Sequence, residues 1–491
     1  MTSVTPTLSP TPSLLVHVFG QRATAMPHAL AYAVYPKGAR QAAQRITWGE
    51  LHSASRAFAA RLLIAGVRAG DRIAIHAGNR PLWPLADLAV QMVGAIGVGI
   101  FPASAPSQVE AMLADAQPVL AITDTAAAFA TVREARDRLG ANFPIVGEGD
   151  GEGNSTGQPG GAAQRWEAWR TEGQMHLNAS AILRAELDAR IAALALDDIA
   201  ALIYTSGSTG EPKGALISHR CLAASAQSIA MVLELQSSDS SVSFLPFSHA
   251  AERVFGQCTR IHAGMASALV EDPADVFAAS ADFQPTLFGA LPRIFERLYE
   301  ATEIARRDGT SARDAITQRI GARCRIATSG GAALPARIAL ELEALGLPVL
   351  GAYGQTEHLC VAMYRRDCLD ADTVCSRCRA PWFASPLTVK CRFVAARSRS
   401  VAISTSPTRR GTRSRRMVNG CAPVIAGRST ASADCASPGV RRNSLHCPTD
   451  ARLPRCPSRR NSLPHRSSRM RCVTGKGTSI SSRCCHCVRG S

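Results

Sequence analysis

The chain has 491 residues, 46% of them hydrophobic, which is sufficient for two or more domains with a large buried core. Its net charge of +17 and its 16 cysteines would suggest nucleic-acid or metal binding, but 25 of the 55 Lys and Arg residues and 12 of the cysteines lie in residues 366–491. Residues 1–365 hold 30 basic and 33 acidic residues, a net charge of −3, which excludes a basic nucleic-acid-binding protein. They hold only four cysteines, Cys221, Cys258, Cys324 and Cys360, which is typical of a protein from a reducing compartment.

The start of the chain does not have the pattern of an export signal. Residues 1–27 contain Pro, Thr and Ser but no basic start followed by a long apolar run, so we expect no secretory signal. The most apolar stretch, residues 85–101, includes Asp87, Gln91 and several glycines, which favours a buried helix leading into a strand over a membrane span. These features predict a cytoplasmic protein.

Strands and helices alternate from residue 30 to residue 124. This alternation predicts a mainly parallel sheet, in which ligands bind beyond the carboxyl ends of the strands. In chain order, the expected elements are a strand at 46–48, a helix at 50–63, a strand at 72–76, a helix at about 85–93, a strand ending at 100–101, a helix at 108–116 and a strand at 119–123.

A segment rich in Gly, Glu, Asp and Ser, residues 147–162, comes next and predicts a flexible surface insertion. The sequence after it continues the α/β pattern to about residue 365, so we expect one α/β domain over residues 1–365. Its later elements are a strand at 199–204, a helix at 218–231, and buried strands at 242–246, 268–271, 286–290, 325–328 and 349–351 with helices between them.

The segment at residues 205–214, directly after a predicted strand, reads Thr-Ser-Gly-Ser-Thr-Gly-Glu-Pro-Lys-Gly. Its glycines let the backbone turn several N–H groups inward, and its hydroxyls and lysine add donors and a positive charge, which together suit a polyphosphate. No Gly-Lys-Ser/Thr ends it, so it is not the common P-loop. A flexible Ser/Gly turn is the alternative, although Pro212 and Lys213 would be superfluous in a linker. The candidate residues are Thr205, Ser206, Gly207, Ser208, Thr209, Gly210 and Lys213.

Two further motifs follow in order: Ser-Gly-Gly-Ala-Ala at 329–333 and Ala-Tyr-Gly-Gln-Thr-Glu at 352–357. Together with the segment at 205–214 they resemble the three ordered motifs of the adenylate-forming enzymes. That family's large domain is built from layered α/β subdomains with a small β region, and the resemblance implies the same fold here. Taken singly, Tyr353 would more often be a packing aromatic and Glu357 a solvated charge.

The resemblance also implies roles for these residues. An aromatic face suits a nucleobase, and a carboxylate is a hard ligand for a hard cation. Carried onto this chain, the roles are an adenine border at Gly330, Gly331 and Ala332, a base-stacking segment at Tyr353, Gly354 and Gln355, catalytic side chains at Lys213, Thr356 and Glu357, and Mg²⁺ ligands at Thr205 and Glu357.

Three segments resemble the long-chain acyl-CoA synthetase branch of that family: residues 98–104, 243–253 and 285–299. In that branch a Leu-Pro-x-x-His stretch lines the path of the acyl chain, which here is Leu245 to His249. Most apolar residues of these segments are expected to be ordinary core. His249 is either a gate of the acyl site or a structural histidine, and both interpretations stay open.

The reaction implied by the resemblance has two halves and no covalent protein nucleophile. A fatty carboxylate attacks the α-phosphate of ATP, which forms acyl-AMP and releases pyrophosphate, with Mg²⁺ and Lys213 offsetting charge. The thiol of coenzyme A then displaces AMP and forms the acyl thioester. The expected partners are thus a fatty acid, ATP and coenzyme A, with possible peripheral membrane contact and no nucleic acid. An aryl- or medium-chain-acid CoA ligase is the first alternative, and a non-catalytic nucleotide- or lipid-binding remnant is the second.

Residues 366–491 do not continue the family pattern. The expected Pro-Met-Pro-Gly turn, Trp-Leu-Arg-Thr-Gly-Asp motif, hinge and catalytic lysine are absent, and the composition is rich in Arg, Ser, Pro and Cys with few aromatic residues. Such a composition cannot bury much of a core, so we expect this tail to be disordered.

A shifted reading frame would explain the tail. With the third base of each codon joined to the first two of the next, residues 419–425 permit Trp-Leu-Arg-Thr-Gly-Asp, residues 434–440 permit the hinge pattern, and residues 376–380 permit Pro-Met-Pro-Gly. Three motifs in order and in one frame predict a shift between about residues 364 and 376. The resulting polypeptide is expected to have little or no activity.

A functional basic tail is the rival interpretation. The Cys-Cys-His-Cys run at 484–487 and the cysteines at 375 and 378 would suggest zinc, and the arginines would suggest nucleic acid. The ligand pairs recur at no regular spacing and no aromatic residues are interleaved for base stacking, so the sequence favours the shifted frame.

Overall fold

The computed structural model describes residues 12–147, 165–206, 212–363 and 393–394. These residues all belong to one compact unit, Met1–Ala402. The predicted insertion, apart from Gly147, lies outside the described residues, and so does the tail after residue 365, apart from Phe393 and Val394. In the described part, no helix combines the length and the apolar character that crossing a membrane requires.

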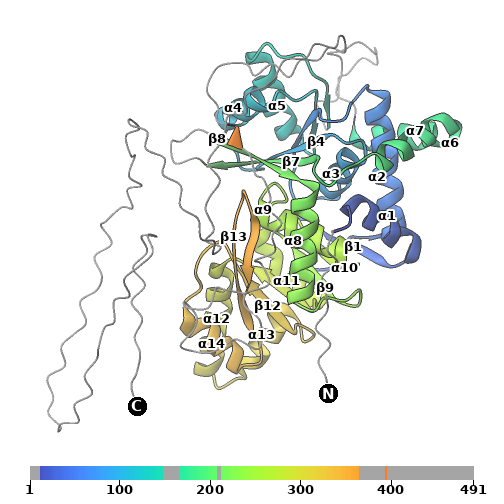
Figure 1. Cartoon of the computed structure of the whole chain (residues 1–491). Coiled ribbons are helices and arrows are strands. Elements are labelled where there is room, and N and C mark those ends of the chain that lie inside the picture. Colours follow the sequence, from blue (N-terminus) through green and yellow to red (C-terminus); the bar gives the residue numbers. More distant parts are fainter. Residues whose placement is uncertain (1–11, 148–164, 207–211, 364–392, 395–491) are drawn as a thin grey trace, which may run out of the picture. The chain divides into compact units, whose positions relative to one another are not determined.

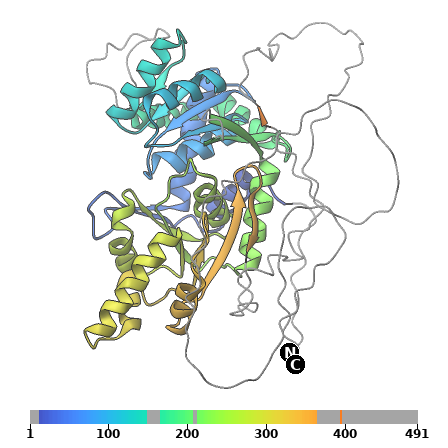
Figure 2. The ribbon, with the colours of Figure 1, turned by 90° about the vertical axis from the view of Figure 1, so that its left-hand side faces the viewer.

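The described chain forms three sheets (Figures 1 and 2). The first is a seven-stranded sheet in which five adjacent strands, ending at one edge, are parallel, while the two strands at the other edge are antiparallel to their neighbours. In spatial order it contains β15 (Phe393–Val394), β8 (Pro212–Ser218), β7 (Ile199–Ser206), β4 (Ile96–Ile100), β3 (Arg72–His76), β5 (Leu120–Thr123) and β6 (Ile145–Val146).

Alternating side chains of this sheet enter two different cores. Ile73 and Ile75 of β3 join one cluster with α2 and α3, whereas Ala74 joins another with α4 and α5. This period of two is what a strand covered on both faces requires. The covering helices are α2 (Trp48–Ile64) and α3 (Leu82–Met92) on one face and α4 (Pro106–Ala116) and α5 (Ala126–Arg138) on the other. Helices α1 (Leu15–Ala25), α6 (Trp166–Ala179) and α7 (Ala181–Ala192) pack outside α2 and α3.

Local signals explain several of these boundaries. Thr47 and Glu50 form a reciprocal capping box at the start of α2, in which the Glu50 N–H donates to Thr47 Oγ1 at 3.2 Å and the Thr47 N–H donates to Glu50 Oε2 at 2.8 Å. Helix α3 is buried along its whole length, which accounts for the apolar run at 85–101. The prediction of a buried helix followed by a strand is therefore confirmed.

The other two sheets have four strands each. One contains β2 (Gln44–Thr47), β1 (Leu30–Tyr35), β10 (Ala266–Val270) and β9 (Ser240–Ser243); the other contains β11 (Leu287–Ala290), β12 (Ile326–Ser329), β13 (Val349–Gln355) and β14 (Leu359–Met363). They meet where the Thr286 N–H donates to the Ser240 carbonyl at 3.0 Å.

The sheet β11–β14 lies between helix α8 (His219–Val232) on one side and helices α12 (Pro292–Arg307) and α13 (Ala312–Ile320) on the other (Figure 2). Leu350 of β13 shares a cluster with Ile229 of α8, and its neighbour Val349 shares one with Phe295 of α12. The remaining helical segments are α9 (Ala250–Glu252), a π-helical stretch (Arg253–Thr259), α10 (Arg260–Ala263), a 3₁₀ turn (Pro273–Asp275), α11 (Val276–Phe283) and α14 (Ala336–Ala344).

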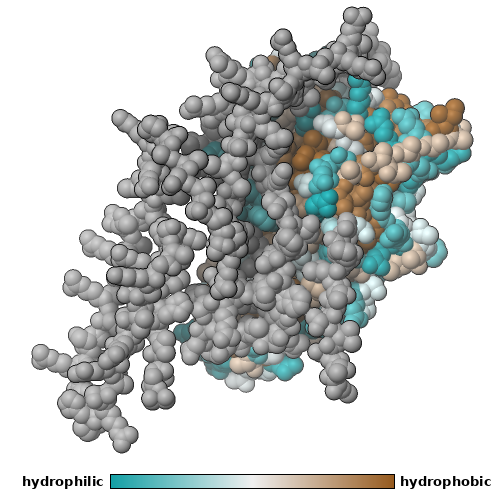
Figure 3. Space-filling model, viewed as in Figure 1, coloured by the Kyte–Doolittle hydropathy of each residue, from teal (hydrophilic) through white to brown (hydrophobic). Residues whose placement is uncertain are grey.

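Hydrophobic residues reach the surface near the end formed by α6 and α7 (Figure 3). Met175 of α6 is 66% exposed and Ile182 of α7 is 82% exposed. Scattered apolar side chains of this kind are normal on a protein surface, and they mark no site by themselves.

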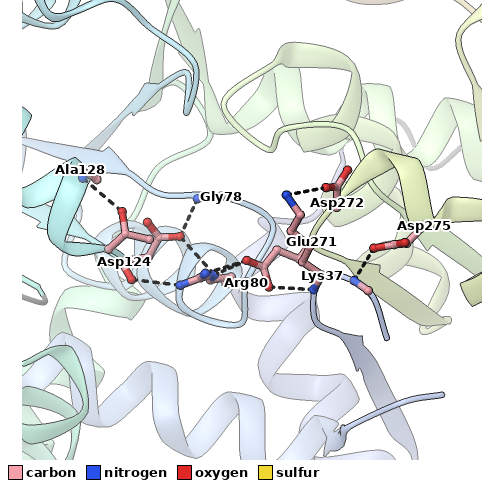
Figure 4. Close-up of polar contacts among 10 residues, drawn as sticks. Lys37, Gly78, Arg80, Asp124, Ala128, Glu271, Asp272 and Asp275 are labelled. Carbon is pink, nitrogen blue, oxygen red and sulfur yellow. Dashed lines mark hydrogen bonds and ion pairs between the residues drawn. The ribbon is translucent and has the colours of Figure 1, made fainter. Parts of the chain in front are cut away.

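A polar cluster joins the seven-stranded sheet to the sheet of β1 and β10 (Figure 4). The Arg80 guanidinium, just after β3, donates to Glu271 Oε1 at 2.6 and 3.0 Å and to the Asp124 carbonyl at 3.3 Å. The Gly78 N–H donates to Asp124 Oδ2 at 2.8 Å, and Lys37 pairs with Asp272 at 3.3 Å. These residues follow the carboxyl ends of β3, β5, β10 and β1, so the charges there are used to hold two sheets together.

Candidate functional site

The two ends of the candidate phosphate loop meet on neighbouring strands. Thr205 of β7 is paired with Lys213 of β8, and the Thr205 hydroxyl donates to the Lys213 carbonyl at 3.4 Å. This antiparallel register brings the two described ends of the segment side by side. Gly207, Ser208, Thr209, Gly210 and the side chain of Ser206 lie outside the described part of the chain.

The second motif begins where β12 ends. Gly331 has φ +81°, in the left-handed region that glycine adopts without strain, and a Cβ there would lie 2.9 Å from Leu291 Cδ2. A Cβ on Gly330 would lie 3.2 Å from the Ala352 carbonyl oxygen. The two glycines therefore let this turn pass close to the neighbouring strand, next to Ala332.

The third motif is a β-hairpin rather than an open loop. Tyr353, Gly354 and Gln355 lie on β13, and Thr356 and Glu357 lie in the turn before β14, which the His358 N–H closes by donating to the Gln355 carbonyl at 3.1 Å. A Cβ on Gly354 would lie 2.3 Å from the Leu359 carbonyl oxygen, so only glycine fits there. Tyr353 is 61% exposed and offers an aromatic face.

A cavity of about 220 Å³ lies between α8, the segment 245–259 and strands β11 and β12. Its wall brings together residues from two of the motifs and from the segment 243–253, namely His249, Gly330, Gly331 and Ala352. Most of the remaining wall is apolar, with Ile229, Leu233, Leu235, Val242, Leu245, Phe255, Met265 and Leu287. The described lining does not include Thr205, Lys213, Tyr353, Thr356 or Glu357.

His249 lies at this wall as the N-cap of α9. Its Nδ1 accepts the N–H of Ala251 at 3.2 Å, and partial desolvation of the ring lowers its pKa. A neutral imidazole with Nδ1 occupied leaves Nε2–H free to donate. The histidine lines the cavity, as a gate of the acyl site would, and it also caps a helix, as a structural histidine would. Both interpretations therefore stay open.

Glu252 is a cavity residue that the sequence reasoning did not single out. It is only 5% exposed, receives hydrogen bonds from the Ser243 hydroxyl and the Leu245 N–H, and burial raises its pKa to about 7. The signal that could have found it is a lone carboxylate inside the apolar run after the Leu-Pro-x-x-His stretch.

Three contacts fix the wall segment 245–259. Asn79, next to Arg80 of the polar cluster in Figure 4, donates its Nδ2–H to the Leu245 carbonyl at 2.7 Å. Arg253 forms a fully buried ion pair with Asp87 of α3, and Gln257 donates to the same carboxylate at 2.9 Å. The cavity wall is therefore held by polar bonds from the seven-stranded sheet and its helix.

The family model for AMP-binding enzymes matches residues 19–384 of the chain. The chain is 28% identical over 354 residues to the long-chain-fatty-acid–CoA ligase FadD15 of Mycobacterium bovis, covering 64% of this chain and 56% of that protein. It is 24% identical over 350 residues to the peroxisomal long chain acyl-CoA synthetase 6 of Arabidopsis thaliana, covering 64% of this chain and 48% of that protein. The chain thus spans about half the length of these curated relatives.

The fold is also found among solved structures. The anthranilate CoA ligase AuaEII in complex with anthranoyl-AMP matches with a TM-score of 0.58 and 18% identity, covering 73% of this chain and 62% of that one. At this identity the likeness concerns the fold alone. It confirms the predicted α/β architecture of the large domain.

Proposed function

The chain belongs to the family of AMP-binding enzymes, and from that premise we propose that its ancestral reaction is ATP-dependent activation of a long-chain fatty acid and transfer of the acyl group to coenzyme A. The observation that carries the proposal is the apolar cavity whose wall includes Gly330, Gly331 and Ala352. The hydrocarbon part of an acid fits the apolar part of this wall, and its carboxylate would lie at the end bordered by the two glycines.

The residues present fit a nucleotide. Gly330 and Gly331 line the cavity without side chains, and Tyr353 offers an exposed ring at the start of the same hairpin as Thr356 and Glu357. In our proposal Tyr353 stacks on adenine, the backbone of 330–332 borders it, and Gly354 and Gln355 complete that segment. Glu357 and Thr205 carry oxygen atoms suited to Mg²⁺, which supplies charge neutralisation at the phosphates when bound.

Lys213 has the role of an electrostatic stabiliser in this proposal. Its position beside Thr205 at the base of the hairpin places a cation next to the proposed phosphate loop, where negative charge develops when the carboxylate attacks the α-phosphate. His249 would orient the acid through its free Nε2–H. No protein nucleophile is needed, because the acyl group passes from phosphate to thiol.

We further propose that residues 366–491 are read in a shifted frame and that the enzyme domain ends near residue 365. The family match stops at residue 384 and leaves most of residues 366–491 unmatched, which supports a change of character in this part of the chain. We also propose that the protein acts in the cytoplasm, in contact with a membrane surface from which it takes up fatty acids.

Acid-dependent ATP–pyrophosphate exchange tests the function. We expect a frame-restored protein to exchange with hexadecanoate more efficiently than with octanoate or benzoate, and the 491-residue chain to form little or no acyl-CoA. Efficient exchange with benzoate alone would instead identify an aryl-acid ligase. Nucleotide binding without exchange by any acid would identify a non-catalytic remnant.

Two glycine-to-alanine variants of the frame-restored protein are compared in this assay. Gly354→Ala should abolish exchange, because its Cβ would collide with the Leu359 backbone and displace the hairpin that carries Tyr353 and Glu357. Gly20→Ala is the control, since its Cβ would meet only His52 at 3.7 Å, and it should retain exchange. Equal activity of the two variants would contradict the role of the hairpin.

A further inference from the structure

Two buried polar side chains lie in the wall of the otherwise mainly apolar cavity. Glu252 ends the short helix α9, and Thr259 ends the π-helical stretch that follows it. Glu252 is 5% exposed and Thr259 is 2% exposed. Because π-helical turns are rare and frequently occur at functional sites, the segment that carries both residues merits a functional explanation.

The Glu252 carboxyl does not have hydrogen-bond partners for both of its oxygens among the described residues. It receives hydrogen bonds from the Ser243 hydroxyl and the Leu245 N–H, yet its Oε1 has no partner in the part of the chain that the structure describes. Gly256, another wall residue, is what makes room for this oxygen, since a Cβ on Gly256 would lie 1.7 Å from Oε1. Burial raises the pKa of the group to about 7, as expected for a carboxyl in an apolar wall.

The Thr259 hydroxyl is also without a partner among the described residues. A threonine within an α-helix commonly donates to the carbonyl four residues earlier, but no such bond satisfies this hydroxyl. A buried polar atom without a partner costs about 1–3 kcal/mol. Two such atoms in one cavity wall are better explained by a partner that enters the cavity than by two separate defects.

We propose that Glu252 and Thr259 form a polar anchor that recognises a hydroxyl group on the hydrocarbon part of the substrate acid. This inference rests on the proposed function, because it assigns the cavity to the acid. A hydroxyl can donate to Glu252 Oε1 and can accept from the Thr259 O–H, so this one kind of ligand group suits both atoms. An unsubstituted chain satisfies neither of them, and a ketone can only accept.

Competition binding to the 491-residue chain tests the proposal. A fluorescent long-chain fatty acid is displaced either by hexadecanoic acid or by hexadecanoic acids with one hydroxyl at successive positions. At least one hydroxy isomer is expected to bind about fivefold or more tightly than hexadecanoic acid, the equivalent of about 1 kcal/mol. Glu252→Leu and Thr259→Val should each reduce that preference below about twofold, whereas Glu252→Gln, which keeps an acceptor oxygen, should retain it.

The outcomes separate this inference from the proposed function. Displacement by hexadecanoic acid without preference for any hydroxy isomer overturns the anchor alone. A preference that survives in Thr259→Val, which removes only a hydroxyl and serves if Glu252→Leu does not fold, also overturns it. If neither kind of acid displaces the probe, the proposed function fails and the anchor fails with it.

Discussion

At the scale of single residues, the candidate site depends on closely packed glycines and on one buried carboxyl. Gly330, Gly331 and Gly354 lie where a side chain would meet neighbouring atoms at 2.3–3.2 Å, and all three belong to motifs that the sequence had marked. Glu252 belongs to a segment that was marked only for its leucine, proline and histidine. Its importance depends on burial, which a sequence pattern does not show.

Glu252 should make the stability of the protein depend on pH. Its pKa rises from 4.5 to about 7 on burial, so the folded state binds more protons than the unfolded state between these values. The contribution is therefore fully present below pH 4.5 and is lost as the pH rises through 7, by an amount on the order of 3 kcal/mol. In Glu252→Gln this loss is absent, so its free energy of unfolding relative to the parent should increase from pH 5 to pH 8.

Denaturant unfolding at several pH values measures this difference. Glu50→Gln is the control, because the hydrogen bond from the Thr47 N–H lowers the pKa of Glu50, and its contribution is lost only as the pH falls. Its offset from the parent should therefore stay nearly constant between pH 5 and pH 8. Parallel profiles for the parent and Glu252→Gln would contradict the account of the buried carboxyl.

At the scale of secondary-structure elements, much of the fold could be predicted. Alternating apolar runs located β3, β4, β5 and β7, and the apolar stretch at 85–101 is the fully buried helix α3 followed by β4. The strand predicted at 242–246 ends instead at Ser243, because the Leu245 N–H is bonded to Glu252 and Pro246 has no N–H to give a neighbouring strand. Hydrogen bonds to distant residues decide such an ending, and they are not visible in a local pattern.

The candidate site was predictable to a similar extent. The first motif was found from its glycines, hydroxyls and lysine, and the other two from their resemblance to a known family. The cavity joins the second motif to the first residue of the third. That the third motif is a hairpin could not be foreseen, since Leu359 has φ +57° and the strand predicted at 349–351 continues to Gln355. The roles of Lys213, Thr356 and Glu357 stay predictions.

The ion pair between Asp87 and Arg253 connects two elements that are far apart in sequence. Both side chains are at most 1% exposed, and Gly97 leaves space for them, since a Cβ there would lie 3.0 Å from Asp87 Oδ1. Asp87→Asn should lower the free energy of unfolding by about 3–5 kcal/mol, because it leaves a buried guanidinium without its counter-charge.

A surface pair provides the comparison for this variant. Asp188 pairs with Arg56 at 2.7 Å but is 61% exposed, so Asp188→Asn should cost less than about 1 kcal/mol. Both variants are compared with the parent by urea unfolding. A cost of Asp87→Asn no larger than that of Asp188→Asn would show that the buried pair does not hold the cavity wall to α3.

At the scale of the whole molecule, the composition divides the chain into two parts of different character. The net charge of +17 arises entirely after residue 365, in a part with few of the aromatic residues that a core needs. The basic composition is therefore poor evidence for a nucleic-acid partner. If the frame is restored, we expect the Pro-Met-Pro-Gly turn, the Trp-Leu-Arg-Thr-Gly-Asp motif and the hinge to return together.

The central claim is that one continuous site holds the acyl chain and the nucleotide. A non-hydrolysable hexadecanoyl-adenylate analogue, with a sulfamoyl group in place of the phosphate, would occupy both parts at once. Its dissociation constant for the 491-residue chain should be at least about a hundredfold lower than that of hexadecanoic acid or of adenosine sulfamate, because the second half binds within the same molecule. Binding of the analogue no tighter than that of its better half would show that the cavity and the hairpin of Tyr353 do not form one site.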